Sequence, residues 1–238
     1  MTYYPILLHL VDQRCVVVGG GEVATRKVEG LLACKARVTV VSPEVIARLR
    51  RSIEEGAVSW IDRPYDSESL RGARLVIGAT NDEAVNRRIF EDCRALGIWC
   101  NIADRPECCD FILPSVIRRG DLIVAVSTSG KSPAFAKTLR RQLEEMFGSE
   151  YAVFLDLMGR IRKRLLAEEH APEAHKHLFE TLIAGGLLEA IRVSDERRID
   201  ALLERTLGSE FRFQELMGQG MPTVEPMVEG EEDRCTRC

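Results

Sequence analysis

A short apolar run that ends in three consecutive glycines constrains this chain more than any other feature. Residues 14–18 (Arg-Cys-Val-Val-Val) have the β-branched character of a strand buried on both faces of a parallel sheet. Residues 23–34 then place apolar side chains at helical spacing, and residues 37–41 are strand-like again. Because parallel strands need a crossover between them, the sequence predicts a βαβ unit.

The alternation continues to about residue 104. Helices are predicted over residues 43–55 and 82–96, and strands over residues 58–61, 75–79 and 99–103. Alternating strands and helices predict the α/β class, with a Rossmann-like parallel sheet covered on both faces.

The pattern changes after residue 104. Two strand-like runs, 111–117 and 122–127, are separated by only four residues, which predicts a β-hairpin. Amphipathic helices follow over residues 133–147, 151–169, 172–183 and 194–207. We therefore predict a Rossmann-like domain at 1–113, a small β-hairpin/helix element at 114–148, a helical C-terminal domain at 149–217 and a disordered acidic tail at 218–238.

The glycine run fits the dinucleotide fingerprint G-x-G-x-x-A. Gly19 permits the tight turn, Gly21 lets the backbone approach a pyrophosphate, and Ala24 lets helix and strand pack closely. A glycine-rich turn can also merely connect two elements, but the strand before it and the helix after it favour nucleotide binding. The predicted cofactor contacts here are Gly19, Gly21, Glu22, Val23 and Ala24.

The second strand ends at Ser42 and Pro43 instead of the carboxylate that usually binds the ribose of NAD. Ser42 can donate a hydrogen bond to the ribose, and no arginine directly follows the strand to hold a 2′-phosphate. Both residues are predicted cofactor contacts, with NAD favoured over NADP. An equally good and compatible interpretation makes Ser42 a helix N-cap and Pro43 the first helical residue.

Polar residues also follow the fourth and fifth strands, at the edge where a ligand of such a sheet lies. Thr80 and Asn81 are predicted cofactor contacts, with helix capping by Thr80, Asn81 or Asp82 as the alternative. Asn101, in the fifth strand, is a further predicted cofactor contact. Asp104 places a carboxylate just past that strand, where it can act as a general base or, alternatively, cap a turn.

A loop of hydroxyls, glycine and lysine precedes the helix predicted at residue 133. Ser127, Thr128, Ser129, Gly130 and Lys131 form a plausible cradle for substrate carboxylates at a helix N-terminus. The alternative is an ordinary capped loop before a solvated basic helix.

Composition narrows the function classes. The net charge is −4, from 33 Lys and Arg against 37 Asp and Glu, so we expect no nucleic-acid partner. The chain starts without a basic leader and lacks an apolar run of about 18 residues, so we expect a cytoplasmic protein without membrane contact. Most of the eight cysteines are expected to be free core thiols. No metal site is predicted, because the terminal pair Cys235 and Cys238 supplies only half of one.

Several segments together resemble the precorrin-2 dehydrogenase/sirohydrochlorin ferrochelatase family, the N-terminal module of bifunctional siroheme synthases, which also occurs alone. The segments that carry the resemblance are residues 5–6 (Pro-Ile), 16–27 (Val-Val-Val-Gly-Gly-Gly-Glu-Val-Ala-Thr-Arg-Lys), 79–82 (Ala-Thr-Asn-Asp) with Asn86, 101–106 (Asn-Ile-Ala-Asp-Arg-Pro), 111–115 (Phe-Ile-Leu-Pro-Ser), and 124–133 (Val-Ala-Val-Ser-Thr-Ser-Gly-Lys-Ser-Pro) with Leu139 and Arg140.

The resemblance implies a homodimer that binds NAD in its Rossmann domain, dimerises through the hairpin and following helix, and uses its helical part to help form a tetrapyrrole cleft. Its substrate would be precorrin-2 and its product sirohydrochlorin, with Asp104 as the base. In bifunctional members that aspartate also takes pyrrole protons as ferrous iron, a second substrate, is inserted. The loop at residues 127–131 would then bind acid side arms of the substrate.

Other functions stay open at this point. The chain departs from the family at Arg105, Cys108 and Cys109, where small residues are usual. The sequence does not decide whether iron is inserted. A dehydrogenase for another small substrate would share the nucleotide-binding half. A non-catalytic NAD-sensing regulator would also share it, but would tolerate Asp104→Asn.

Overall fold

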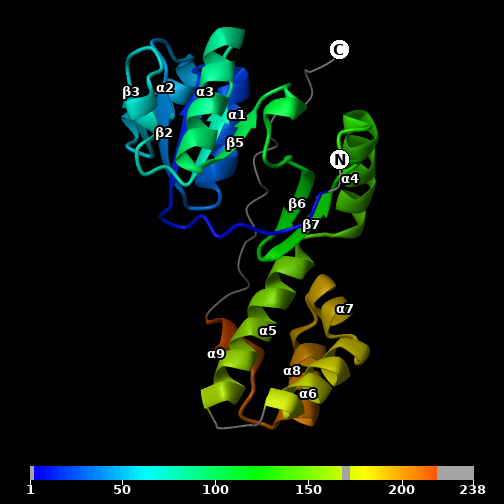
Figure 1. The fold of residues 1–238 in the computed structure, drawn as a ribbon. Coiled ribbons are helices and arrows are strands. Elements are labelled where there is room, and N and C mark those ends of the chain that lie inside the picture. Colours follow the sequence, from blue (N-terminus) through cyan, green and yellow to red (C-terminus); the bar gives the residue numbers. More distant parts are fainter. Residues whose placement is uncertain (1–2, 168–171, 219–238) are drawn as a thin grey trace. The chain divides into compact units, whose positions relative to one another are not determined.

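The computed structural model of the protein describes residues 3–167 and 172–218. Within these ranges the chain forms two compact units, one comprising residues 3–113 with Ser129–Lys131 and the other comprising Pro114–Thr128 with residues 132–167 and 172–218 (Figure 1). None of the helices in the described ranges is both long and apolar enough to cross a membrane.

The first unit is built on a five-stranded parallel sheet in the order β3-β2-β1-β4-β5. The strands are β1 (Arg14–Val18), β2 (Arg37–Val41), β3 (Val58–Ile61), β4 (Leu75–Gly78) and β5 (Trp99–Ile102). They are connected by α1 (Glu22–Leu32), α2 (Ala47–Glu54), α3 (Glu83–Leu96) and the 3₁₀ turn η1 (Ser67–Leu70), and a second 3₁₀ turn, η2 (Pro106–Cys108), follows β5. The strand order reverses between β1 and β4, which makes this the switch point where sheets of this kind bind ligands.

Both faces of this sheet are buried, as its apolar strands predict. Cys15 and Val17 of β1 pack on the side of α1 and α2, whereas Val16 and Val18 pack with α3. All four side chains are buried, and successive residues of a strand point to opposite faces. The predicted α/β class and Rossmann-like sheet are therefore confirmed.

The second unit combines a hairpin with helices. Strands β6 (Ser115–Arg119) and β7 (Leu122–Val126) pair antiparallel through a two-residue turn, in which Gly120 has a φ of +57°. The helices are α4 (Pro133–Met146), α5 (Glu150–Ala167), α6 (Pro172–Ala184), α7 (Leu187–Arg192), α8 (Glu196–Leu207) and α9 (Phe213–Met217). Leu157, Ile161, Leu187, Leu203 and Phe211 are fully or almost fully buried in the core that α5, α7 and α8 share.

Some predicted boundaries are wrong. Helix α2 begins at Ala47 and not at Pro43, because the backbone N–H of Ile46 donates to the carbonyl of Gly20 at 2.9 Å and holds the preceding residues in a loop. The first hairpin strand begins at Ser115 and not near residue 111. Helices α7 and α9 have six and five residues and are too short to show a period in the sequence. The predicted tail lies, apart from Gly218, outside the described residues.

Candidate functional site

The three glycines after β1 are needed for different reasons. A Cβ on Gly19, whose φ is +125°, would overlap the carbonyl oxygen of Ala79, and one on Gly20 would overlap that of Glu44. Gly21 has an ordinary extended conformation, and a Cβ there would meet no described atom within 4 Å. Protein packing therefore explains the first two glycines, whereas the third leaves open space beside the helix start.

Helix α1 begins at this open space without a side-chain cap from the described residues. Thr25 is buried, and both its backbone N–H and its hydroxyl donate to the carbonyl of Gly21, with donor–acceptor distances of 2.9 and 3.0 Å. The N–H groups of Glu22, Val23 and Ala24 precede that first bond and have no intrahelical acceptor. Uncapped N–H groups at a positive helix end bind phosphate, so these residues fit the pyrophosphate of a dinucleotide.

Ser42 lies beside the glycine run but is already engaged in its own loop. Its hydroxyl donates to the carbonyl of Glu44 at 2.6 Å, and its own carbonyl accepts from Trp60 Nε1 at 2.9 Å. A ribose would therefore have to donate to Ser42 instead of accepting from it. The interpretation of Ser42 and Pro43 as N-cap and first helical residue is wrong, because Ile46 directly precedes α2.

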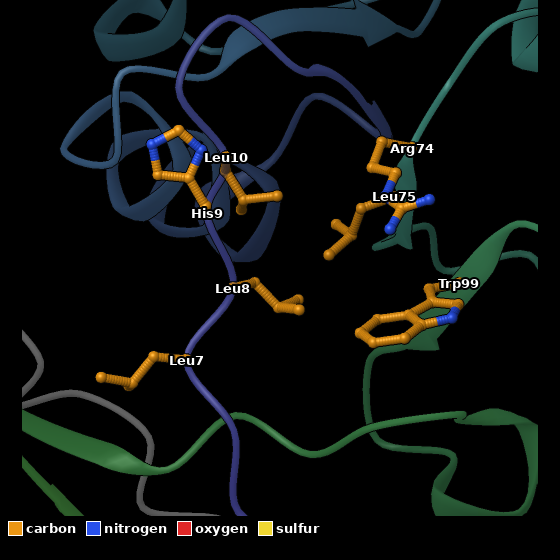
Figure 2. A pocket seen from close by; sticks show the side chains of 7 residues that line it. All are labelled: Leu7, Leu8, His9, Leu10, Arg74, Leu75 and Trp99. Carbon is orange, nitrogen blue, oxygen red and sulfur yellow. The ribbon is translucent and has the colours of Figure 1, made fainter.

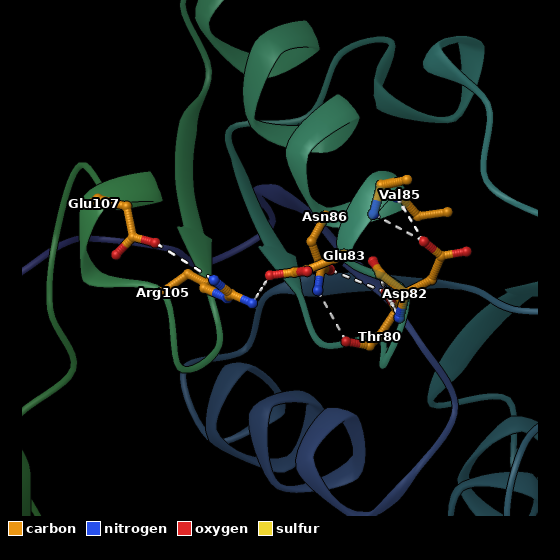
Figure 3. Close-up of polar contacts among 8 residues, drawn as sticks. Thr80, Asp82, Glu83, Val85, Asn86, Arg105 and Glu107 are labelled. Atoms are coloured by element: carbon orange, nitrogen blue, oxygen red, sulfur yellow. Dashed lines mark hydrogen bonds and ion pairs between the residues drawn. The ribbon is translucent and has the colours of Figure 1, made fainter.

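The loop after β4 is held by side-chain hydrogen bonds within it and by one residue of α3, Asn86 (Figure 3). The Asn86 amide donates to the carbonyl of Thr80 at 2.9 Å, and the Thr80 hydroxyl lies 3.0 Å from Asn86 Oδ1. Asp82 caps α3 by accepting from the N–H groups two and three residues further on, at 2.9 and 3.1 Å. Of the capping alternatives, Asp82 is therefore the residue that caps. Asn81 is exposed and forms no hydrogen bond to the described residues.

Asp104 lies on a tight turn just past β5. The backbone N–H of Arg105 donates to the carbonyl of Ile102 at 3.3 Å, and Asp104 occupies the third position of this turn with a φ of +61°. This left-handed conformation costs an L-residue on the order of 1 kcal/mol. The Asp104 side chain is exposed, and no hydrogen bond or ion pair joins its carboxylate to the described part of the chain. The turn thus presents an unpaired carboxylate at the sheet edge that carries the glycine run.

Arg105 follows Asp104 at a position where small residues are usual, and it pairs with carboxylates other than that of Asp104. Its guanidinium forms an ion pair with Glu83 at the start of α3 and lies 3.9 Å from a carboxylate oxygen of Glu107 (Figure 3). These two carboxylates balance the added charge, so Arg105 is not a ready counter-ion for Asp104.

The opposite edge of the sheet holds a cavity of about 200 Å³ (Figure 2). It lies between the extended N-terminal segment and the amino ends of β4 and β5, against Leu8, Arg74, Leu75 and Trp99. None of the predicted site residues lines it. The predicted cofactor contacts of the first unit lie instead at or beside the carboxyl ends of β1, β2, β4 and β5.

The chain is similar to known proteins over most of its length. One family model, described as putative NAD(P)-binding, matches residues 6–115, and another, described as sirohaem biosynthesis protein central, matches residues 119–146. The siroheme synthases of Nitrosospira multiformis and Hydrogenovibrio crunogenus are 38% and 32% identical over 214 and 233 residues. The chain is therefore similar in sequence to siroheme synthases. These alignments cover 88% and 97% of this chain but 45% and 48% of the relatives, so it spans about half the length of the curated relatives it matches.

A solved structure described as "SirC, precorrin-2 dehydrogenase" is similar to this chain. The TM-score is 0.70 at 25% sequence identity, and the match covers 86% of this chain and 98% of that one. The sheet, the hairpin and the helical part therefore occur together in another protein.

The loop from Ser127 to Lys131 is ordered by backbone and hydroxyl contacts. Ser129 and Gly130 have φ values of +54° and +80°, and the Thr128 hydroxyl accepts from the N–H of Ser132 at 3.1 Å. Ser132 in turn caps α4 by accepting from the N–H three residues further on at 3.2 Å. Ser127 and Thr128 belong to the second unit and residues 129–131 to the first. Lys131 is exposed.

Helix α4 is not the uniformly solvated basic helix of the alternative interpretation. The side chain of Arg140 is only 15% exposed and pairs with Glu144, one turn further along the helix. Within the described residues, Nη1 of Arg140 is therefore occupied by Glu144, whereas its buried Nε has no hydrogen-bond partner.

Sequence reasoning does not place Asn86 and Cys109 among the site residues. Each acts through side-chain bonds to a residue six to eight positions away, Thr80 for Asn86 and Asn101 for Cys109. Such contacts follow no helical or strand period. The only available signals were the presence of Asn86 in a family segment and the unusual position of Cys109.

Proposed function

We propose that the protein catalyses the NAD-dependent dehydrogenation of precorrin-2 to sirohydrochlorin. The observation that carries the proposal is the exposed, unpaired carboxylate of Asp104 on the sheet edge that holds the glycine run. The likeness to a precorrin-2 dehydrogenase over nearly all of that protein's length supports it. The reaction removes two hydrogens from the macrocycle, one as a hydride and one as a proton.

The nucleotide is held by the residues around the glycine run. The N–H groups of Glu22, Val23 and Ala24 bind the pyrophosphate, and the open space at Gly21 lets the backbone approach it. When bound, NAD accepts the hydride. Asn81, exposed after β4, binds the nucleotide from the neighbouring strand end.

The charges near β2 and β3 support NAD over NADP. Arg48 lies 2.8 Å from a carboxylate oxygen of Glu29, and Arg63 lies 3.0 Å from one of Asp66. A 2′-phosphate is usually held by an arginine in this region. Arg48 and Arg63 would each have to break an ion pair to bind the 2′-phosphate of NADP. The hydroxyl oxygen of Ser42, in contrast, can accept a hydrogen bond from the unmodified ribose of NAD.

Asp104 takes the proton. Its carboxylate stands at the surface and has no described side chain to compete for its oxygens. A positioned general base of this kind contributes about a hundredfold to ten-thousandfold to a rate. The loop at Ser127–Lys131 supports binding of the carboxylate-rich substrate through its hydroxyls and the Lys131 ammonium.

The protein also acts, in this proposal, as a homodimer in the cytoplasm. Free thiols are typical of a reducing compartment, and Cys15, Cys93, Cys100, Cys108 and Cys109 are all free thiols in the described ranges. Sedimentation of the purified protein tests the dimer, since a monomer at working concentration would contradict it.

The function is tested by an anaerobic absorbance time course of precorrin-2 with purified protein and NAD. Sirohydrochlorin should form faster than without protein. No acceleration would overturn the proposal, and retained NAD binding in that case would favour a non-catalytic sensor or a dehydrogenase of another substrate. Ferrous iron is then added, and sirohaem formation above the protein-free rate would add metal insertion to the activities of this site.

A further inference from the structure

The chain doubles back after the turn that carries Asp104. It passes through η2 and forms an isolated antiparallel bridge between Asn101 and Cys109, so that residues 109–110 lie along the free edge of β5. Asp110 fixes this return, because its N–H donates to the carbonyl of Cys100 and its carboxylate accepts from the N–H of Cys100, both at 2.9 Å.

The thiol of Cys109 sits inside this loop and contacts both ends of the Asp104 turn. Its sulfur accepts from the backbone N–H of Ile102 at 3.3 Å, and lies 3.2 Å from the Ile102 carbonyl oxygen and 3.1 Å from that of Arg105. A thiol donates one hydrogen at a time, so these two carbonyls share its proton. Burial raises the pKa of the Cys109 thiol, which keeps the proton in place at neutral pH.

The amide of Asn101 completes the arrangement. Asn101 is only 8% exposed, and its Nδ2 donates to the carbonyl of Phe111 at 2.9 Å and to the Cys109 sulfur at 3.4 Å. An amide nitrogen has two hydrogens, and both have acceptors inside the protein. The side chain of Asn101 therefore has no N–H left to donate to a nucleotide.

A left-handed aspartate persists only where its surroundings fix the backbone. We propose that Asn101 and Cys109 are positioning residues that hold the turn carrying Asp104, and that Asn101 does not contact the nucleotide. The catalytic part of this inference rests on the proposed function, because it assigns the turn to the base of that reaction. The structural part of the inference, that the two side chains fix residues 102–105, is independent of the proposed function.

The test compares Asn101→Ala and Cys109→Ala with the matched control Cys108→Ala. Cys108 is the neighbouring thiol, and its side chain forms no hydrogen bond to the described residues. Displacing the base slows turnover but does not weaken nucleotide binding. In Asn101→Ala and Cys109→Ala, kcat should therefore fall about ten- to a hundredfold while the Kd of NAD stays unchanged. Cys108→Ala should match the wild type, and Cys109→Ser, which keeps a donor and an acceptor, should restore most of kcat.

The two positions should also be coupled. Because both side chains belong to one network, the double variant Asn101→Ala/Cys109→Ala should lose little more activity than the worse single variant. Independent losses that multiply would overturn a shared role. Weaker NAD binding by Asn101→Ala with kcat retained at saturating NAD would overturn the assignment and make Asn101 a cofactor contact. Unchanged kcat in both single variants would also overturn it.

Hydrogen exchange separates this inference from the proposed function. If the wild type does not convert precorrin-2, the proposed function is overturned. The hydrogen-exchange rates of the backbone amides of residues 102–105 still test whether Asn101 and Cys109 hold the turn. These amides should exchange faster in Asn101→Ala and Cys109→Ala than in the wild type and in Cys108→Ala. Exchange at the wild-type rate in all variants would contradict the inference.

Discussion

Thr80 and Asn86 are joined by paired contacts at the carboxyl end of β4, with the Asn86 amide 2.9 Å from the Thr80 carbonyl and the Thr80 hydroxyl 3.0 Å from Asn86 Oδ1. Asn86 is buried on the first turns of α3, so the helix fixes the loop that faces the glycine run. The position of a predicted cofactor contact thus depends on a side chain outside the loop itself.

Asn86→Ala should lower the free energy of unfolding by about 1 to 3 kcal/mol, because it removes the amide that bonds the Thr80 carbonyl. The loop should also hold the nucleotide less well, raising the Kd of NAD. Denaturant unfolding and a NAD titration measure the two effects. The exposed neighbour Arg87→Ala is the control and should leave both values at the wild-type level. A fully stable Asn86→Ala protein would contradict the role given to this contact.

Gly20→Ala and Gly21→Ala should separate folding from binding. A methyl on Gly20 would overlap the Glu44 carbonyl and should cost about 1 to 3 kcal/mol of stability. A methyl on Gly21 meets open space, so the expected loss of stability is only the preference for glycine over alanine at a helix N-cap, up to about 1 kcal/mol.

For Gly21→Ala the Kd of NAD should nonetheless rise by at least about tenfold, because the methyl occupies the path of the pyrophosphate. Unfolding curves and NAD titrations of both variants provide the comparison. Unchanged NAD affinity in Gly21→Ala would show that the open space is not part of the nucleotide site.

Asp104→Gly should be inactive and yet at least as stable as the wild type. Glycine adopts the φ of +61° without the steric cost of an L-residue, so the free energy of unfolding should rise by up to about 1 kcal/mol. Asp104→Ala keeps the steric cost and should be the least stable of the three proteins. Thermal unfolding ranks them, and a destabilised Asp104→Gly protein would mean that the aspartate side chain itself supports the turn.

Alkaline pH should destabilise the protein partly through Cys15. Burial raises the pKa of this thiol from 9.0 to about 11, with the nearby Cys34 as a smaller cause. Because the unfolded thiol ionises first, its contribution is fully present below pH 9 and is lost as the pH rises to 11. Cys15→Ala lacks this contribution, so its stability deficit relative to the wild type should shrink over that range in denaturant unfolding. A constant deficit would contradict the raised pKa.

The sheet could be predicted from the sequence because each strand is a short apolar run in an alternating pattern, as Arg14–Val18 illustrates. The site could be predicted only in part. Gly19, Thr80 and Asp104 follow strand ends, and parallel topology brings strand ends together. Which atoms are engaged could not be predicted, since the Ser42 hydroxyl is bonded within its loop and the Asn101 amide across a returning chain. Such contacts depend on loop conformation, which leaves no periodic signal.

The most direct test of the account compares wild type and Asp104→Asn for NADH and sirohydrochlorin formation from precorrin-2, with the Kd of NAD measured for both. Asparagine tolerates the left-handed turn but cannot take a proton. The wild type should form the two products one to one, and Asp104→Asn should lose at least about a hundredfold in rate with NAD affinity unchanged. Turnover of Asp104→Asn at the wild-type rate would contradict the assignment of the base.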